Sequence, residues 1–282
     1  MIDKIKNKSI INYIINNRKA HIPNSNSYKK LKTYFKNYFR NHLKKKESKF
    51  YLAHIGKFTL PYFKMGKINS SHLLGLDEII IFTFYILNKK KISRVVDLGA
   101  NIGMHSIILG KLGYKVKSFE PDPDHIKEFL KNKKINKLKN VKLIKKAVDI
   151  KRGNVIFTKI INNTTGSFIK NAKKETFGPI KKFKVKTESF KNILKWAQLI
   201  KMDVEGLEAD LINTIKFKDL INKKIILEVG SKKNAKKIFS HAKKNKFSLF
   251  SQKIGWNLVK KPVDMPFSYK EGSLIISSKN II

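Results

Sequence analysis

Two carboxylates frame a glycine-rich turn in the first half of the chain. Asp97 stands in a short apolar run, Gly99 and Gly103 follow it, and Glu120 comes roughly 20 residues later. An acid that ends a strand can accept hydrogen bonds from both hydroxyls of a ribose, and this offset is the expected one. The residues therefore predict a binding site for a nucleoside-like ligand.

The spacing of the two glycines narrows the choice of ligand. Three residues separate Gly99 from Gly103, so the middle glycine of a dinucleotide-binding turn is missing. This argues against a pyrophosphate across the turn, while an acid such as Asp97 before it suits a cationic ligand. S-adenosylmethionine has an amino group, a sulfonium and a ribose but no phosphate, and it is the cofactor that these residues favour. An ordinary strand–turn–helix unit is the alternative.

A second group of residues with chemical potential lies near position 200. Lys201, Asp203 and Glu205 alternate at the end of an apolar run and precede Gly206. Carboxylates there can hold a hydroxyl or remove its proton, and a general base contributes roughly 10²–10⁴-fold to a rate. Lys201 can pair with an acid or with an anionic substrate. Alternatively, Glu205 caps the next helix and Asp203 binds loop amides.

Both groups need elements that bring them to one edge of a sheet. Apolar runs predict strands at 95–98, 114–119, 141–144, 153–160, 199–202, 225–229, 247–251 and 273–277. Helical spacing after Gly103, Pro123 and Gly206 places helices between these strands, which indicates a doubly wound α/β fold. Ligands of such sheets bind at the carboxyl ends of the strands, where both groups would lie.

Three short words resemble those of a known family. Asp-Leu-Gly-Ala-Asn-Ile-Gly at 97–103, Phe-Glu-Pro-Asp-Pro at 119–123 and Lys-Met-Asp-Val-Glu-Gly at 201–206 look like the FkbM family of class I methyltransferases. The resemblance covers roughly residues 75–230. It implies a Rossmann-like seven-stranded sheet in the order 3-2-1-4-5-7-6, and O-methylation of a hydroxyl on a glycan, a sugar or a small metabolite. Glu188-Ser189 departs from the Leu-Asp pair usual in that family.

The resemblance also implies roles for individual residues. The catalytic candidates are Asp203, Glu205 and Lys201, and an upstream acid, Glu78, would lie near the cofactor. Residues implied to bind S-adenosylmethionine are Asp97, Gly99, Ala100, Asn101, Gly103, Glu120, Pro121, Asp122, Ala147 and Val148. Val148 would offer an apolar face to the adenine. No cluster of residues has metal-ligand spacing, so we expect no metal site.

The charge of the chain suggests a different function. Its 282 residues carry a formal charge of +42, which is typical of proteins that bind nucleic acid. Only four of the basic residues are arginines, the side chains that read phosphates and bases bidentately: Arg18, Arg40, Arg94 and Arg152. We therefore expect a solvated lysine surface, with a weak preference for anionic substrates left open. The alternatives are an RNA or DNA methyltransferase and a non-catalytic binding module on the same fold.

The remaining expectations concern organisation. A basic extension of helices and a hairpin would occupy residues 1–74, and the methyltransferase domain residues 75–282. The extension and the loop at 160–182 would contribute to the acceptor pocket. The chain lacks cysteine, a signal-peptide pattern and a transmembrane run, which together predict a cytoplasmic protein. No pattern sets an oligomeric state.

Overall fold

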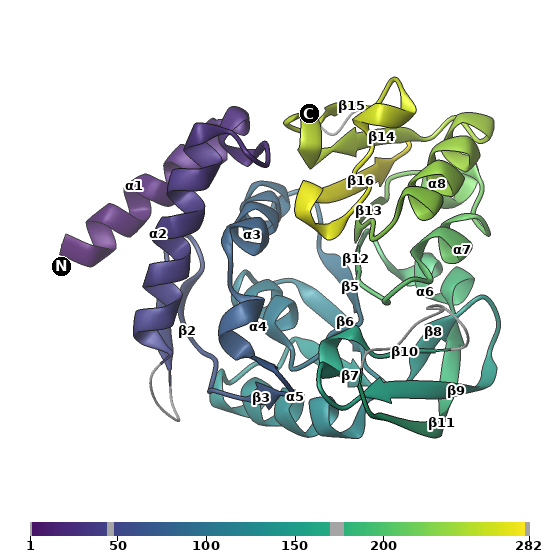
Figure 1. Ribbon diagram of the computed structural model, residues 1–282, viewed down its shortest axis with the longest axis horizontal. Coiled ribbons are helices and arrows are strands. Elements are labelled where there is room, and N and C mark those ends of the chain that lie inside the picture. The colour runs from purple at the N-terminus through teal and green to yellow at the C-terminus, as the bar shows by residue number, and fades with distance from the viewer. Residues whose placement is uncertain (1, 44–47, 170–177, 280–282) are drawn as a thin grey trace.

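The computed structural model describes residues 2–43, 48–169 and 178–279, and its centre is an eight-stranded sheet (Figure 1). The strand order is β15-β14-β16-β13-β12-β5-β6-β7, with β16 and β15 antiparallel to the rest. The strands are β5 (Arg94–Leu98), β6 (Lys115–Phe119), β7 (Val141–Ile144), β12 (Leu199–Met202), β13 (Lys224–Glu228), β14 (Ser248–Ser251), β15 (Asn257–Leu258) and β16 (Ser273–Ser277).

This topology confirms the predicted fold class. Seven strands follow the order 3-2-1-4-5-7-6, which is that of the Rossmann-like class I methyltransferase sheet. The predicted number of strands was too low by one, because β15 adds a short edge strand beside β14. Gly255 permits it, since its φ of +70° turns the chain back on itself.

Helices cover both faces of the sheet and create two cores. The helices α3 (Leu76–Asn88), α4 (Met104–Lys111) and α5 (Pro123–Ile135) lie over one face, and α6 (Phe190–Trp196), α7 (Glu208–Ile212) and α8 (Lys232–Lys244) over the other (Figure 1). Successive residues of β5 point to opposite faces, so Val95 joins the first core and Val96 the second. By the same alternation Asp97 faces the α3 side of the sheet.

The N-terminal residues pack against α3 and share its core. They form the helices α1 (Ile2–Asn16) and α2 (Asn26–His42), the hairpin β1 (Lys49–Leu52) and β2 (Gly56–Thr59), and the pair β3 (Lys64–Met65) and β4 (Ile68–Asn69). The aromatic residues Phe35 and Phe39 of α2 are buried in the same hydrophobic cluster as Phe82 of α3. The division of domains at residue 74 stays a prediction.

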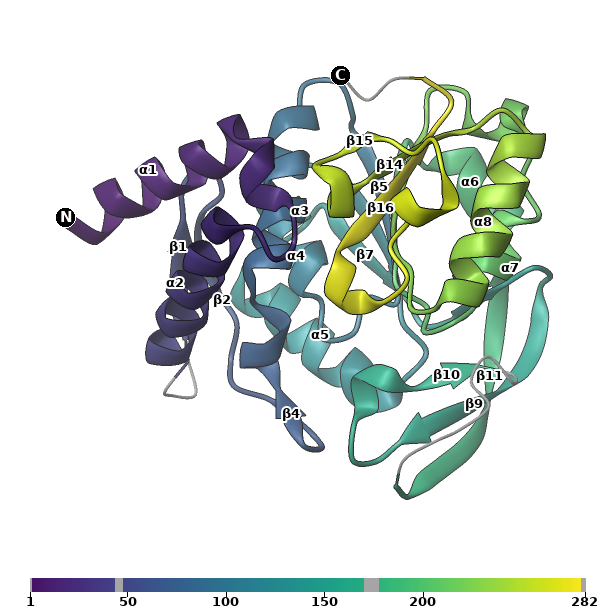
Figure 2. The same cartoon turned by 45° about the horizontal axis from the view of Figure 1, so that its top comes forward.

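A second, smaller sheet stands beside the carboxyl ends of the central strands. Its order is β10-β9-β11-β8, built from β8 (Ala147–Asp149), β9 (Gly153–Ile160), β10 (Phe168–Ile169) and β11 (Ile180–Ser189). The long antiparallel pair β9–β11 twists away from the main body (Figure 2). The expected loop at 160–182 begins here, but its residues 170–177 lie outside the described part of the chain.

Candidate active site

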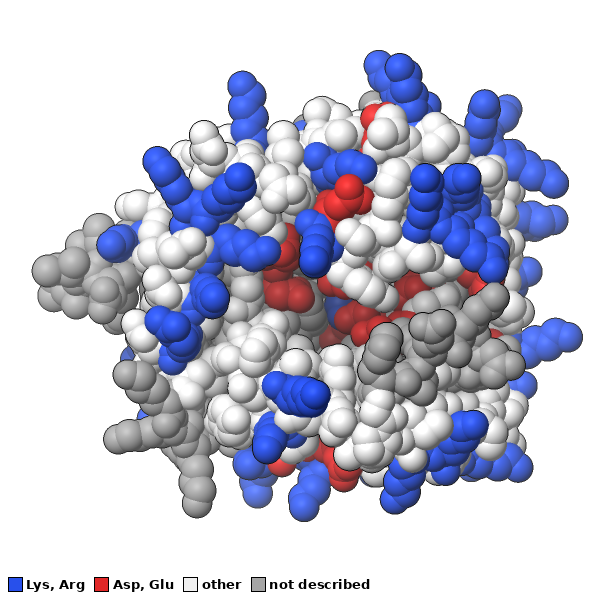
Figure 3. All heavy atoms as spheres, viewed as in Figure 1, with Lys and Arg blue, Asp and Glu red and all other residues white. Residues whose placement is uncertain are grey.

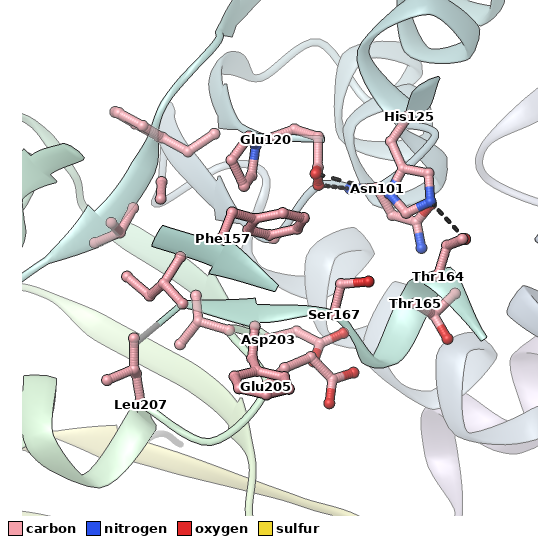
Figure 4. Close-up of a pocket in the computed structure, with 18 of the residues that line it drawn as sticks. Asn101, Glu120, His125, Phe157, Thr164, Thr165, Ser167, Asp203, Glu205 and Leu207 are labelled. Carbon is pink, nitrogen blue, oxygen red and sulfur yellow. Dashed lines mark hydrogen bonds and ion pairs between the residues drawn. The ribbon is translucent and has the colours of Figure 1, made fainter. Parts of the chain in front are cut away.

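A pocket opens between the carboxyl ends of the central strands and the small sheet (Figure 4). The space inside it, counted up to and including its open mouth, is about 700 Å³. Most residues predicted for the site line it: Gly99, Asn101, Glu120, Pro121, Ala147, Val148, Asp203 and Glu205. The first and second sequence groups therefore meet in one cavity.

Gly99 joins these two groups directly. Its φ is +72°, and a Cβ atom at this position would lie 1.8 Å from the backbone oxygen of Asp203. The N–H of Asp203 also donates to the carbonyl of Leu98 at 3.0 Å. Gly99 therefore lets the backbone approach Asp203 closely, which fixes the turn after β5 against the turn after β12.

Glu120 ties the first turn to the end of β6. It accepts the N–H of Asn101 at 2.7 Å and the N–H of Asp122 at 2.9 Å, and it is 4% exposed. Each carboxylate oxygen has a second acceptor position, so Glu120 can still accept a hydroxyl from a ligand. Asn101 adopts φ +50°, which is uncommon outside glycine and is held by this contact.

Four predicted cofactor residues lie behind the pocket wall: Asp97, Ala100, Gly103 and Asp122. Gly103 begins α4 at φ +89°, with the ring of Phe129 where a side chain would stand. Asp122 caps α5 and forms an ion pair with the buried Lys159 at 2.9 Å. Ala100 donates to the carbonyl of Phe119 at 3.0 Å. These residues shape the two turns and do not reach the cavity surface.

Asp97 is completely buried and only half satisfied. Its Oδ2 accepts the hydroxyl of Ser106 at 2.6 Å, whereas its Oδ1 has no hydrogen bond. A buried polar atom without a partner is costly, and such atoms tend to occur at functional sites. Asp97 pairs in register with Lys201 of β12, so its charge faces the cation of that neighbouring strand.

The apolar wall of the pocket comes partly from residues that the sequence analysis missed. Ala147 and Val148 of β8 line it as predicted, and Phe157 of β9 and Leu207 complete it. Phe157 carried only a strand signal in the sequence. Its role depends on how the small sheet folds back over the carboxyl edge, which no local pattern encodes.

His125 and Thr164 were also missed as pocket residues. The His125 ring and the Thr164 hydroxyl lie 2.9 Å apart, and the His125 Nδ1 is 3.7 Å from Glu120 (Figure 4). This contact joins α5 to the segment that precedes β10. The first part of the loop expected at 160–182 reaches the pocket here, because Thr164, Thr165 and Ser167 line it.

Lys201 is buried beneath the site and does not line the cavity. Its ammonium lies 3.3 Å from Asp203 Oδ2. Burial lowers the pKa of Lys201, but Asp203, Asp97 and two further carboxylates outweigh it and hold this pKa above its ordinary value. Lys201 therefore stays charged and cannot act as a base, and it orients the Asp203 carboxylate.

Glu208 binds the backbone of the turn after β12. Its carboxylate accepts the N–H groups of Val204 and Gly206 at 3.0 Å each. The role of Glu205, in catalysis or in capping, stays a prediction. Glu205 lines the pocket at φ +55°, a left-handed conformation that costs a non-glycine residue of order 1–3 kcal/mol.

An acid–histidine pair lies on the α3 side of the site. Glu78, in the first turn of α3, is 2.7 Å from His105 Nε2, and His105 Nδ1 is 3.0 Å from the hydroxyl of Tyr85. Burial raises the pKa of Glu78, but His105 and Lys201 outweigh it and keep the carboxyl ionised. Glu78, suggested by family resemblance, thus belongs to the same charge network as Lys201.

The described residues contain no cluster of three or more histidine, aspartate or glutamate side chains arranged to hold a metal ion. In the same part of the chain, no helix combines the length and the apolar character needed to cross a membrane.

Comparison with protein-family models and with curated proteins gave no match. Several solved structures are similar to the chain in their backbone arrangement. A ribosomal protein L11 methylase from Lactobacillus delbrueckii subsp. bulgaricus has 16% identity, covers 69% of this chain and 76% of its own, and gives a TM-score of 0.37. An rRNA methylase from Streptococcus thermophilus has 10% identity, coverages of 71% and 95%, and a TM-score of 0.38.

A methyltransferase candidate from Streptococcus mutans in complex with SAH is similar at 12% identity, with coverages of 70% and 94% and a TM-score of 0.38. TM-scores this low describe a loose likeness. The fold assignment rests on the strand order of the central sheet, and the site on its own geometry.

Proposed function

We propose that the protein is an S-adenosylmethionine-dependent methyltransferase of the FkbM type, which methylates a hydroxyl of a glycan, a sugar or a small metabolite. The observation that carries the proposal is the contact of Gly99 with Asp203. It sets the turn predicted to bind a nucleoside directly beside a pair of carboxylates in one pocket.

The residues present fit this cofactor. Glu120 can accept ribose hydroxyls, and Val148 with Phe157 forms an apolar slot for a flat base. Asp97 lies buried behind the pocket wall near the turn, and a carboxylate there suits a cofactor that carries positive charge. No phosphate-binding glycine turn is needed, because this cofactor has no phosphate.

When bound, the cofactor supplies an electrophilic methyl group on a sulfonium. The protein has to orient the acceptor oxygen in line with that group, and orientation can contribute several kcal/mol of the barrier. Asp203 or Glu205 accepts the hydroxyl proton, and the Lys201 ammonium holds the Asp203 carboxylate at 3.3 Å while it does so. The small sheet, through Phe157, excludes water from the pocket.

Isothermal calorimetry with S-adenosylmethionine and with S-adenosylhomocysteine tests the cofactor. We expect binding of both by the wild-type chain, and weaker binding by Glu120→Gln because an acceptor for ribose hydroxyls becomes an amide. Asp210→Asn is the matched control, since Asp210 pairs with Lys237 at the surface of α7 and α8. Absence of binding by a folded wild-type chain would refute the proposal.

The acceptor class is tested by transfer of a radiolabelled methyl group into cell extract that is then digested with nuclease or with glycosidase. We expect glycosidase, and not nuclease, to release the label from large products, while label in small molecules points to a metabolite. Label that only nuclease releases would instead favour an RNA or DNA methyltransferase.

A further inference from the structure

The long ribbon of β9 and β11 has two unlike faces. Residues that pair across the two strands share a face, and successive residues along each strand alternate between faces. Phe157 pairs with Phe183 and Val155 pairs with Val185, and this inner face packs into the second core. The opposite face is called here the outer ribbon face, and its exposed residues are Asn154, Ile156, Ile180, Lys182, Lys184 and Lys186.

Exposed isoleucines gather on and around this ribbon. Ile156 is 49% exposed in the middle of β9, and Ile180 is 42% exposed at the start of β11. Two more exposed isoleucines lie next to the two ends of β9: Ile150 and Ile161. Apolar side chains exposed one at a time are normal on a protein surface, but a group of them marks a surface that binds something.

The outer ribbon face is also positive. Its three lysines alternate along β11, and β9 contains no acid. The one acid of β11 is Glu188, which already pairs with Lys146 at 3.2 Å and with Arg152 at 2.5 Å. The partner that complements this face in charge is therefore an anion.

Lysines alone do not single out a surface of this protein, because they project around most of its outline (Figure 3). Helix α8 shows what the ribbon adds. It exposes lysines such as Lys233, Lys236 and Lys244, but its apolar residues Ala235 and Ile238 are buried in the second core. The outer ribbon face differs because its exposed isoleucines stand among its lysines, and Ile156 pairs in register with Lys184.

This combination fits a lipid surface better than a nucleic acid. Anionic lipid headgroups attract lysines, and apolar side chains enter the boundary between headgroups and acyl chains. Binding of a nucleic-acid strand depends instead on exposed aromatic rings on which bases stack. The aromatic rings of the ribbon, Phe157 and Phe183, belong to the inner face, and nucleic-acid phosphates offer the isoleucines no apolar partner.

We propose that the outer ribbon face binds the surface of an anionic lipid bilayer. The three lysines lie over lipid phosphates, and Ile156 and Ile180 insert among the headgroups. Phe157 follows Ile156, points to the opposite face and lines the pocket, so the docked ribbon keeps the pocket close to the bilayer. The inference goes beyond the proposed function, because it names a partner of the protein and does not depend on methyl transfer.

Co-sedimentation of the full chain with vesicles tests this surface. One set of vesicles is pure phosphatidylcholine, and the other contains about one third phosphatidylglycerol. We expect the chain to bind the anionic vesicles much more strongly than the neutral ones. Each lysine near an anionic surface contributes roughly a 5-fold factor, so replacing Lys182, Lys184 and Lys186 together by glutamine should weaken this binding at least ~10-fold.

Two matched controls separate the ribbon from the general charge of the chain. Replacing Lys233, Lys236 and Lys244 of α8 by glutamine removes the same charge and should leave most of the binding intact. Ile156→Ser should weaken binding several-fold, whereas Leu130→Ser, at a residue of α5 that is 43% exposed, should not. Circular dichroism on each variant confirms that it is folded before vesicles are added.

Three outcomes with the vesicles would overturn the inference: no binding of the anionic vesicles by the wild-type chain, equal binding of both kinds of vesicle, or an equal loss of binding in the α8 variant. Single-stranded RNA is titrated in parallel. A chain that ignores vesicles but binds this RNA, and loses that binding with the ribbon lysines, would also overturn it and make the ribbon a nucleic-acid surface.

Discussion

Asp203 is the residue whose chemistry is most directly testable. Asp203 lines the pocket, and its Oδ2 lies 3.3 Å from the ammonium nitrogen of Lys201. We expect Asp203→Asn to lower kcat by roughly 10²–10⁴-fold, because a proton acceptor is lost, while cofactor affinity changes by a factor of a few. Steady-state kinetics and calorimetry on the same preparation check both parts. Full activity of Asp203→Asn would make Glu205 the base.

Glu205 combines a site position with a strained backbone. A backbone φ of +55° costs a glutamate more conformational energy than it costs a glycine. We therefore expect Glu205→Gly to raise the free energy of unfolding by up to ~1 kcal/mol and to lower turnover. Lys137→Gly is the control, because Lys137 also has φ +55° but follows the C-cap of α5 and does not line the pocket. Urea denaturation should show both variants stabilised and only the first one inactive. A destabilised Glu205→Gly chain would contradict the idea of strain.

Glu188 gives the fold a pH dependence. Burial raises its pKa, but Arg152, Lys146 and the N–H of Ser189 outweigh burial and hold this pKa at about 2. In the folded chain the pKa of Glu188 lies below its ordinary value of 4.5. The ionised Glu188 carboxylate therefore stabilises the fold fully above pH 4.5, and this stabilisation is lost as the pH falls toward 2. Because Arg152 is mostly exposed and its ion pair is screened by solvent, we expect the charge of Glu188 to contribute only ~1–2 kcal/mol to the free energy of unfolding.

The measurement compares urea denaturation of wild type and Glu188→Gln across this pH range. The variant should be less stable at neutral pH, and the difference should shrink as the pH falls below 4.5. Asp210→Asn should show no comparable trend. A constant difference at all pH values would mean that Glu188 acts through packing and not through its charge.

At the scale of elements, the turn after β5 depends on the turn after β12. A Cβ at Gly99 would overlap the backbone of Asp203, so Gly99→Ala should cost several kcal/mol of unfolding free energy and abolish cofactor binding. Gly113→Ala is the matched control, since Gly113 has φ +89° but nothing lies within 4 Å of its Cβ position. It should cost only ~1 kcal/mol and leave binding unchanged. Thermal denaturation and calorimetry distinguish the two variants.

Helices and strands whose apolar residues recur at a regular spacing could be predicted from the sequence. Features that depend on tertiary contacts could not. The run around Asp97 and the helix after Pro123 follow from apolar spacing and from N-terminal capping, and both were found. Phe157 and His125 look like ordinary strand and helix residues, and only the position of the small sheet makes them part of the pocket. The burial of Lys201 likewise depends on its neighbours in adjacent strands.

At the scale of the whole molecule, the N-terminal helices are connected to the site through one short network. The Tyr28 hydroxyl donates to Asp77 at 2.8 Å, Gln252 donates to the same carboxylate at 3.0 Å, and Trp256 donates to His21 at 2.8 Å. Asp77 precedes Glu78 in the first turn of α3. The extension therefore helps to hold the first turn of α3, which carries Glu78.

Removing this link should destabilise the chain as a unit. We expect Tyr28→Phe to lower the free energy of unfolding by ~1–2 kcal/mol, because Asp77 loses a partly buried hydrogen bond. Tyr13→Phe is the control, since the Tyr13 hydroxyl bonds Ser27 at 3.3 Å in an exposed position. Chemical denaturation followed by fluorescence should give one transition for each protein. Two separate transitions would show that residues 1–74 unfold independently.

The short strand β15 has a consequence for solubility. The open edge of a sheet is a template on which a second chain can add, and this sequence is rich in the isoleucines that favour such pairing. On the β14 side, β15 pairs with Phe250 and Ser251, and both of its own residues are exposed. On the opposite side, the four-residue edge strand β7 carries the exposed Lys142. Both margins of the sheet are therefore poor starting points for edge-to-edge aggregation.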